Sequence, residues 1–196
     1  HVRSRRQRQM CIRDSPNAKA GLDFTTPFEL LIATILSAQC TDVRVNKVTA
    51  VLFKEHNTPK TILDLGVDGL AKYIKSCGLY KTKSKNIINT CNVLYHDYDS
   101  KVPDTIDELM KLPGVGRKTA NVVVSNAFGT PAIAVDTHVF RVTNRIGIVN
   151  EKDVLSTEKA LMQEIPRDRW SKSHHLFIWH GRNLCKARNP RCEECI

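Results

Sequence analysis

The sequence predicts an all-α protein, and three observations lead to this class. Apolar residues recur at helical spacing through most of the chain, and no stretch of useful length alternates between apolar and polar residues. Helix-start signals precede several of these runs, as at Thr26-Pro27 and Thr58-Pro59. With 196 residues, 41% of them hydrophobic, the chain is long and apolar enough to bury a core.

The first predicted helix begins at Pro27. Thr26 can accept a hydrogen bond from the first turn, Pro27 suits the first helical position, and Glu29 would complete a capping box. Residues 28–36 are then almost entirely apolar, which predicts a buried helix that ends at 37–40.

Four more helices are predicted before residue 100. One starts at Thr41, a short one follows Thr58-Pro59, and Gly66 begins the passage to the next. Residues 78–80 interrupt the helical pattern, which resumes over 81–95. The apolar positions expected in the helix after Thr41 are Val43, Val45, Val48, Val51, Leu52 and Phe53.

A helical hairpin follows, with helices predicted at 104–111 and 116–128. Pro113 closes the first helix because proline removes a backbone donor. Gly114 and Gly116 then allow a tight turn whose bare backbone can come close to a partner.

The second helix of this hairpin opens with two cations, Arg117 and Lys118. Its first N–H groups have no acceptor inside the helix, so this end predicts an anion site, most simply for a phosphate. The same residues also fit an ordinary hairpin in which the glycines only form the turn.

The last third of the chain is also predicted to be helical. Residues 132–135 form a short extended link to Asp136, which can cap the helix that carries Val139, Phe140, Val142 and Ile146. Two further helices are predicted at 154–165 and 170–184.

Charge and cysteine usage narrow the class of partner. A formal net charge of +10 points to a polyanion, and nucleic acid fits better than an acidic small molecule. No apolar run reaches the roughly 20 residues of a membrane span, and the first residues do not read as a signal peptide. Four of the seven cysteines are scattered, which favours reduced, intracellular thiols.

Residues 1–15 are basic and have no apolar period. They could be a DNA-binding arm or a targeting peptide, but a non-native or disordered segment, extending to residue 20, is the preferred interpretation. The chain is expected to be truncated at both ends.

The hairpin LPGVGRKTANVVV (112–124) and the segment VDTHVFRV (135–142), with their mutual spacing, resemble the endonuclease III family of DNA glycosylases. The resemblance runs from about Thr25 to the end. It implies two helical lobes, a helix-hairpin-helix lobe at 21–130 and a carboxyl-terminal lobe at 131–196, with the active site in the cleft between them.

The resemblance also implies different catalytic roles for two residues. Lys118 would displace the base and hold the sugar as a Schiff base, while the Asp136 carboxylate stabilises positive charge that develops on the sugar. A simple phosphate contact is the alternative role for Lys118, and a helix cap is the alternative for Asp136. His138 would support the site and the DNA contact.

Further residues are assigned to DNA through the resemblance. Gly114, Gly116 and Arg117 would approach the backbone. Gln39 and Leu79 would fill the space left by an extruded nucleotide, because an inserted side chain offsets part of the cost of unstacking. Without the resemblance, an exposed Leu-Tyr is better explained as the lid of a core.

Cys185, Cys192 and Cys195 follow the spacing with which this family holds a 4Fe–4S cluster. Four thiolates are needed, and the fourth would lie beyond Ile196. Three ordinary cysteines in a protein that has lost its cluster are the alternative.

The sequence therefore predicts a bifunctional base excision repair enzyme that removes oxidised pyrimidines and cleaves the abasic site by β-elimination. A glycosylase for thymine or uracil opposite guanine is one alternative, and a non-catalytic DNA-binding module is another. The expected partner is duplex DNA with damaged bases or abasic sites, bound by a monomer without a membrane, in the cytoplasm and at the nucleoid if the source is bacterial.

Overall fold

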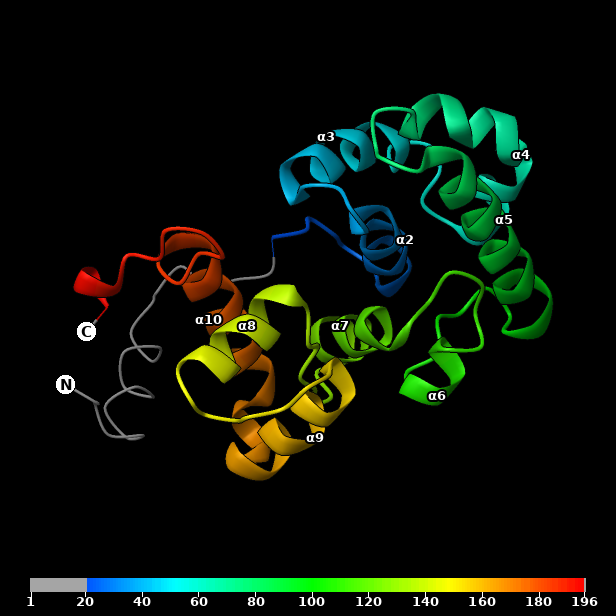
Figure 1. The fold of residues 1–196 in the computed structure, drawn as a ribbon. Helices are drawn as coiled ribbons and strands as arrows, with labels where there is room; N and C mark the ends of the chain where they lie inside the picture. The colour runs from blue at the N-terminus through cyan, green and yellow to red at the C-terminus, as the bar shows by residue number, and fades with distance from the viewer. Residues whose placement is uncertain (1–20, 196) are drawn as a thin grey trace. The chain divides into compact units, whose positions relative to one another are not determined.

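A computed structural model describes residues 21–195 of the chain (Figure 1). Residues 1–20, and with them the predicted non-native segment, lie outside that range. The described part contains helices and no strand, which confirms the predicted all-α class. The helices are α2 (Pro27–Ser37), α3 (Asp42–Leu52), α4 (Pro59–Ile74), α5 (Tyr80–Asp97), α6 (Ile106–Leu109), α7 (Arg117–Ala127), α8 (Thr137–Arg145), α9 (Val154–Glu164) and α10 (Trp170–Asn183), with short 3-10 turns at Arg167–Arg169 and Cys192–Glu194.

The described residues fall into two compact units, Gly21–Gly129 and the segment from Thr130 onward. In the first unit α2 is the central helix and packs against α3, α5 and α7, while α4 runs along α5 (Figure 1). Leu31, Ile32 and Leu36 of α2 are completely buried. Burial of this apolar surface is the main force that holds the unit together.

The start of α2 forms differently from the predicted capping box. Thr26 Oγ1 accepts from Glu29 N at 3.2 Å, as expected. The Glu29 carboxylate, however, reaches one residue further back and accepts from Thr25 N at 2.6 Å and Thr25 Oγ1 at 2.7 Å. The cap therefore also fixes the chain that enters the helix.

The predicted apolar set of α3 was wrong at two positions. Val43 and Val51 are 69% and 55% exposed, whereas Val45, Val48 and Leu52 are buried. The buried residues are three and four apart and lie on one helical face, and the two exposed valines fall on the other.

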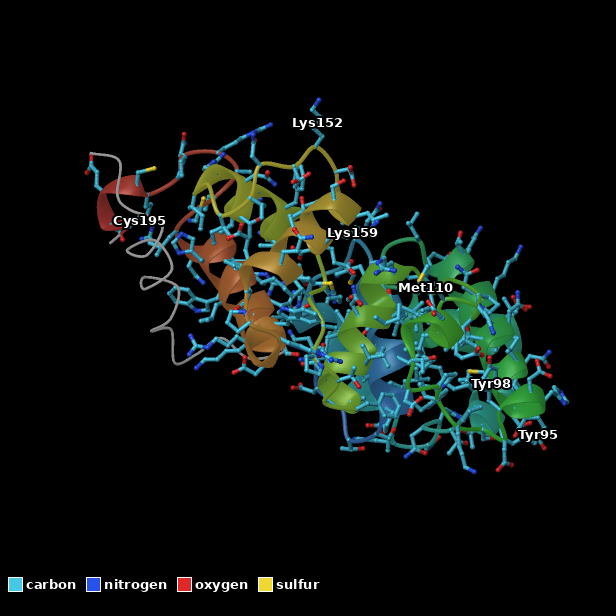
Figure 2. All side chains as sticks on the ribbon, turned by 90° about the horizontal axis from the view of Figure 1, so that it is seen from below. Tyr95, Tyr98, Met110, Lys152, Lys159 and Cys195 are labelled. Atoms are coloured by element: carbon cyan, nitrogen blue, oxygen red, sulfur yellow. The ribbon has the colours of Figure 1, made fainter. Side chains whose placement is uncertain are left out.

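Local features set the element boundaries at two points of this unit. Gly66 (φ 65°) has a non-helical backbone and divides α4 into two helical segments at a kink, which confirms the predicted break. The first hairpin helix is only α6, because its cap is Thr105 and not Asp104. Tyr98, labelled in Figure 2, donates from its hydroxyl to Glu108 Oε2 at 2.5 Å and so ties the end of α5 to α6.

The second unit has its own apolar core, built on α8, α9 and α10. Helices α8 and α10 pack closely. At Gly181 the approach is so close that an added Cβ would lie only 3.0 Å from Val142 Cγ2. Asp153 caps α9 by accepting from Ser156 N at 2.9 Å. Among the described residues, no helix has the length and apolar character that crossing a membrane requires.

Candidate active site

The hairpin turn is held against α5 by its backbone. Thr90 Oγ1 donates to Pro113 O at 2.6 Å. Gly114 has φ 77°, and a Cβ at that position would lie 2.8 Å from Asn86 Nδ2 and 2.9 Å from Asn86 Cβ. Only glycine fits here, for both backbone conformation and space.

Gly116 differs from Gly114 in backbone conformation and in surroundings, although the sequence motif does not distinguish the two glycines. It is the N-cap of α7 with φ −91°, a conformation open to any residue, and a Cβ added to it would meet no described atom within 4 Å. No side chain of residues 21–195 caps this helix end. The packing of the chain does not require a glycine at 116, so the turn leaves an open approach to the first N–H groups of α7.

Lys118 is the second residue of α7, and its side chain is exposed, while the neighbouring Arg117 is half-buried. The Lys118 side chain is therefore accessible to a partner. Both cations lie in the first turn of α7, as predicted, so positive charge stands at a helix end that no side chain of the described residues caps.

Asp136 lies in the second unit and caps α8, as the sequence predicted. Its Oδ1 accepts from His138 N and Val139 N, both at 2.8 Å. Both bonds go to one oxygen, so Oδ2 is outside the cap. The half-buried carboxylate is thus fixed in position by the helix end.

His138 follows directly within α8. Burial lowers its pKa below the usual 6.5, Arg141 and Arg182 act in the same direction, and Asp136 opposes them. The imidazole is therefore neutral at pH 7.

Arg141 contacts His138 and was not named in the sequence analysis. Its Nη2 contacts His138 Nδ1 at 3.2 Å and donates to Gly181 O at 2.9 Å and Cys185 O at 3.0 Å. It connects α8 to the end of α10. The partners are 40 and 44 residues away along the chain, so no local pattern could have indicated them.

Gln39 and Leu79 belong to two loops that touch. Both residues have left-handed backbones, with φ 53° and 57°, and both side chains are exposed. A Cβ on Gly78 would lie 3.2 Å from Gln39 O, so the loops meet through their backbones. Such conformations cost roughly 1–3 kcal/mol each and often mark functional positions.

The structure does not bring the three predicted cluster ligands together. No three His, Cys, Asp or Glu side chains of residues 21–195 gather as a metal site. Cys185 is buried with Sγ 3.7 Å from Arg145 Nη1, Cys195 Sγ lies 3.8 Å from His180 Nε2, and Cys192 is exposed. As placed, these thiols do not fit a cluster, and the 4Fe–4S group stays a prediction.

Comparison with known proteins first gives the class. The family model described as "HhH-GPD superfamily base excision DNA repair protein" matches residues 32–167. This match spans more than half of the chain, including the hairpin, Lys118 and Asp136.

Individual relatives narrow the class further. Endonuclease III of Bacillus subtilis (strain 168) is 54% identical over 181 residues, which are 92% of this chain and 83% of that protein. For endonuclease III of Escherichia coli (strain K12) the identity is 51%, over 93% of this chain and 87% of that protein. A solved structure of a trapped endonuclease III–DNA covalent intermediate, 49% identical, matches with a TM-score of 0.93 over 98% of this chain and 93% of its own.

The chain belongs to the endonuclease III family of DNA glycosylases and abasic-site lyases. The family resemblance seen in the sequence is thereby confirmed, as is the predicted class of enzyme, a base excision repair glycosylase and lyase.

Proposed function

We propose that this chain excises oxidised pyrimidines from duplex DNA and then cleaves the abasic strand through Lys118. The observation that carries the proposal is the α7 start. There an exposed lysine stands beside a helix end that no described side chain caps, and beside Gly116, where an added Cβ would enter open space. This end suits a phosphodiester backbone, which is an anion that must approach closely.

Lys118 is proposed as the nucleophile. A lysine must lose its proton before it can attack, and most lysines are protonated at neutral pH. The proposed mechanism therefore requires an unprotonated Lys118 amine in the complex with DNA. The amine attacks C1′, the base leaves, and the resulting Schiff base acidifies the C2′ proton, so that β-elimination breaks the strand.

Asp136 is proposed to stabilise the positive charge that develops on the sugar as the base departs. Its Oδ1 is occupied by the two N–H groups of α8, and Oδ2 is the oxygen assigned to the sugar. Neutral His138 beside it adds no positive charge that would compete for the carboxylate.

DNA contacts are proposed for Gly114, Gly116 and Arg117 at the phosphates, and for Gln39 and Leu79 at the vacated base position. The exposed side chains on two touching, strained loops support the second assignment. We further propose that the protein acts on DNA as a monomer.

The experiment is borohydride trapping on a duplex with one abasic site. Lys118→Gln is expected to abolish the covalent adduct and to keep most DNA binding. Lys152→Gln is the matched control, because Lys152 is an exposed lysine that extends away from the second unit (Figure 2) and its loss removes the same charge. An adduct from Lys118→Gln equal to that of the parent would refute the lysine mechanism, and equal loss of binding and trapping would reduce Lys118 to a phosphate contact.

Base preference is tested with the same preparation. Excision of an oxidised pyrimidine at least tenfold faster than excision of thymine or uracil opposite guanine is expected. The reverse order would establish the mismatch alternative instead, with the lysine chemistry unchanged.

A further inference from the structure

Two cysteines lie where the loops of Gln39 and Leu79 meet. Cys40 follows Gln39 between α2 and α3, and Cys77 precedes Gly78 between α4 and α5. The backbones of the two loops are in contact, since a Cβ on Gly78 would lie 3.2 Å from Gln39 O.

The two thiols lie on either side of this backbone contact. Cys40 directly follows Gln39 and Cys77 directly precedes Gly78, so the loops bring together two cysteines that are far apart in the sequence. Cys40 also contributes to the raised pKa of Cys77, which agrees with their proximity. Cys77 is completely buried, whereas Cys40 is half-buried and therefore the thiol that solvent reaches.

Lys83 is a buried basic residue close to this pair of cysteines. Lys83 is 4% exposed, and its Nζ donates to Leu36 O at 2.8 Å. Burial lowers the pKa of Lys83, while the two thiols act to raise it, which shows that the ammonium is within electrostatic reach of both sulfurs. Lys83 accordingly opposes the rise in the pKa of Cys77 that burial causes.

We propose that Cys40 and Cys77 form an oxidation site, a dithiol that hydrogen peroxide converts to a disulfide joining the two loops. No role for either cysteine follows from the family assignment, and neither is a predicted cluster ligand.

The reaction proceeds in two balanced steps. The Cys40 thiolate attacks peroxide, which breaks the O–O bond, gives the sulfenic acid and, with one proton, releases water. The Cys77 sulfur then attacks the Cys40 sulfur, the S–S bond forms, and the hydroxyl leaves with the Cys77 proton as a second water. Two thiols lose two electrons and peroxide gains them.

The environment of each thiol fits its step. Burial raises the pKa of Cys77 to about 11, with Cys40 adding to the rise and Lys83 and Arg44 opposing it. Cys77 is therefore a poor first target. Once Cys40 is a neutral sulfenic acid, its contribution disappears and the two cations remain, so Cys77 becomes easier to deprotonate just when it must react. The contact between the two loop backbones supplies the proximity.

The disulfide would fix the loops that present Gln39 and Leu79. If those residues enter the DNA, which rests on the proposed function, oxidation is expected to weaken binding to an abasic duplex about tenfold. Exchange with a small thiol would reverse the effect, as for accessible disulfides in general.

The test is peptide mapping of the full chain after treatment with hydrogen peroxide. Trypsin places Cys40 and Cys77 on peptides 20–44 and 76–81, and their cross-linked product is expected after oxidation and absent after reduction. Cys40→Ser and Cys77→Ala must both abolish it; Cys40→Ser alters a half-buried position and keeps the test valid if Cys77→Ala folds poorly. Cys91→Ser is the matched control, because Cys91 is fully buried and burial raises its pKa to about 12.

Cross-linked peptide in the parent and in Cys91→Ser supports the inference. Sulfinic acid on Cys40 with a free Cys77 thiol, or separate alkylation of both cysteines after oxidation, overturns it. This readout needs no DNA, so it is independent of the proposed function. A disulfide that forms while binding to abasic duplex stays unchanged would instead count against the DNA role of Gln39 and Leu79.

Discussion

Helices α7 and α8 start in opposite ways, although each carries one proposed catalytic residue. The α7 start has Gly116 as its N-cap and, within the part of the chain that the structure describes, no side-chain acceptor, whereas Asp136 caps the α8 start by accepting from two N–H groups. The first end is left for an external anion, and the second is satisfied from within. The comparison teaches that Lys118 carries little of the fold, while Asp136 contributes to both fold and chemistry.

Two substitutions of Asp136 separate these contributions and give the largest expected effect. Asp136→Asn keeps an oxygen that can cap α8 but removes the negative charge, so excision is expected to fall a hundredfold or more with little change in thermal stability. Asp136→Ala is expected to lose the same activity and also about 1 kcal/mol of the free energy of unfolding.

Excision rates and thermal unfolding of both variants are the measurements. If Asp136→Asn kept the parent's activity, the residue would be a cap and nothing more. Lys118→Gln offers the contrast, since an exposed side chain is expected to be replaced at almost no cost in stability.

The two hairpin glycines give the next effect in size. Gly114→Ala must place a Cβ within 3 Å of Asn86 at φ 77°, so a loss of about 1–3 kcal/mol of stability is expected. Gly116→Ala meets no atom within 4 Å and is expected to leave stability within about 0.5 kcal/mol of the parent. Its DNA affinity is nevertheless expected to fall roughly tenfold, because the methyl group intrudes on the phosphate approach.

Denaturant unfolding and binding to an abasic duplex distinguish the pair. Equal stability of both variants would contradict the packing argument at Gly114. Unchanged affinity in Gly116→Ala would show that its open surroundings serve no ligand.

Local signals in the sequence were sufficient for most of this fold. Caps such as Thr26 and Asp136 and the breaks at Gly66 and 78–80 depend on neighbouring residues, so they could be predicted. The exposure of Val43 could not, because it depends on which face of α3 meets the core.

The candidate site likewise has a part that could be predicted from local sequence and a part that could not. Lys118 and Asp136 were named from a motif, and the cap geometry of Asp136 agrees with its neighbours in sequence. The contacts of Arg141 and the proximity of Cys40 to Cys77 were not predicted, because each joins segments that are distant along the chain. The contrast between Gly114 and Gly116 escaped it too, since it depends on where Asn86 of α5 lies.

Substitution of His138 is expected to have the smallest effect. Its test compares the stability of the protein, with and without this histidine at the α8 start, at two pH values. Burial lowers its folded pKa below 6.5, so the unfolded chain binds the proton more readily. The stability that comes from keeping His138 neutral is therefore fully present above pH 6.5 and is lost as the pH falls from 6.5 toward the folded pKa.

His138→Gln cannot be protonated, so its stability is expected to decline less than that of the parent between pH 7 and pH 5. The measurement is thermal unfolding at both pH values. Burial also lowers the pKa values of His175 and His180, so the variant still loses some stability at the lower pH. Only the difference between parent and variant is due to His138. An equal decline in the two proteins would mean that protonated His138 is tolerated beside Asp136 in the folded state.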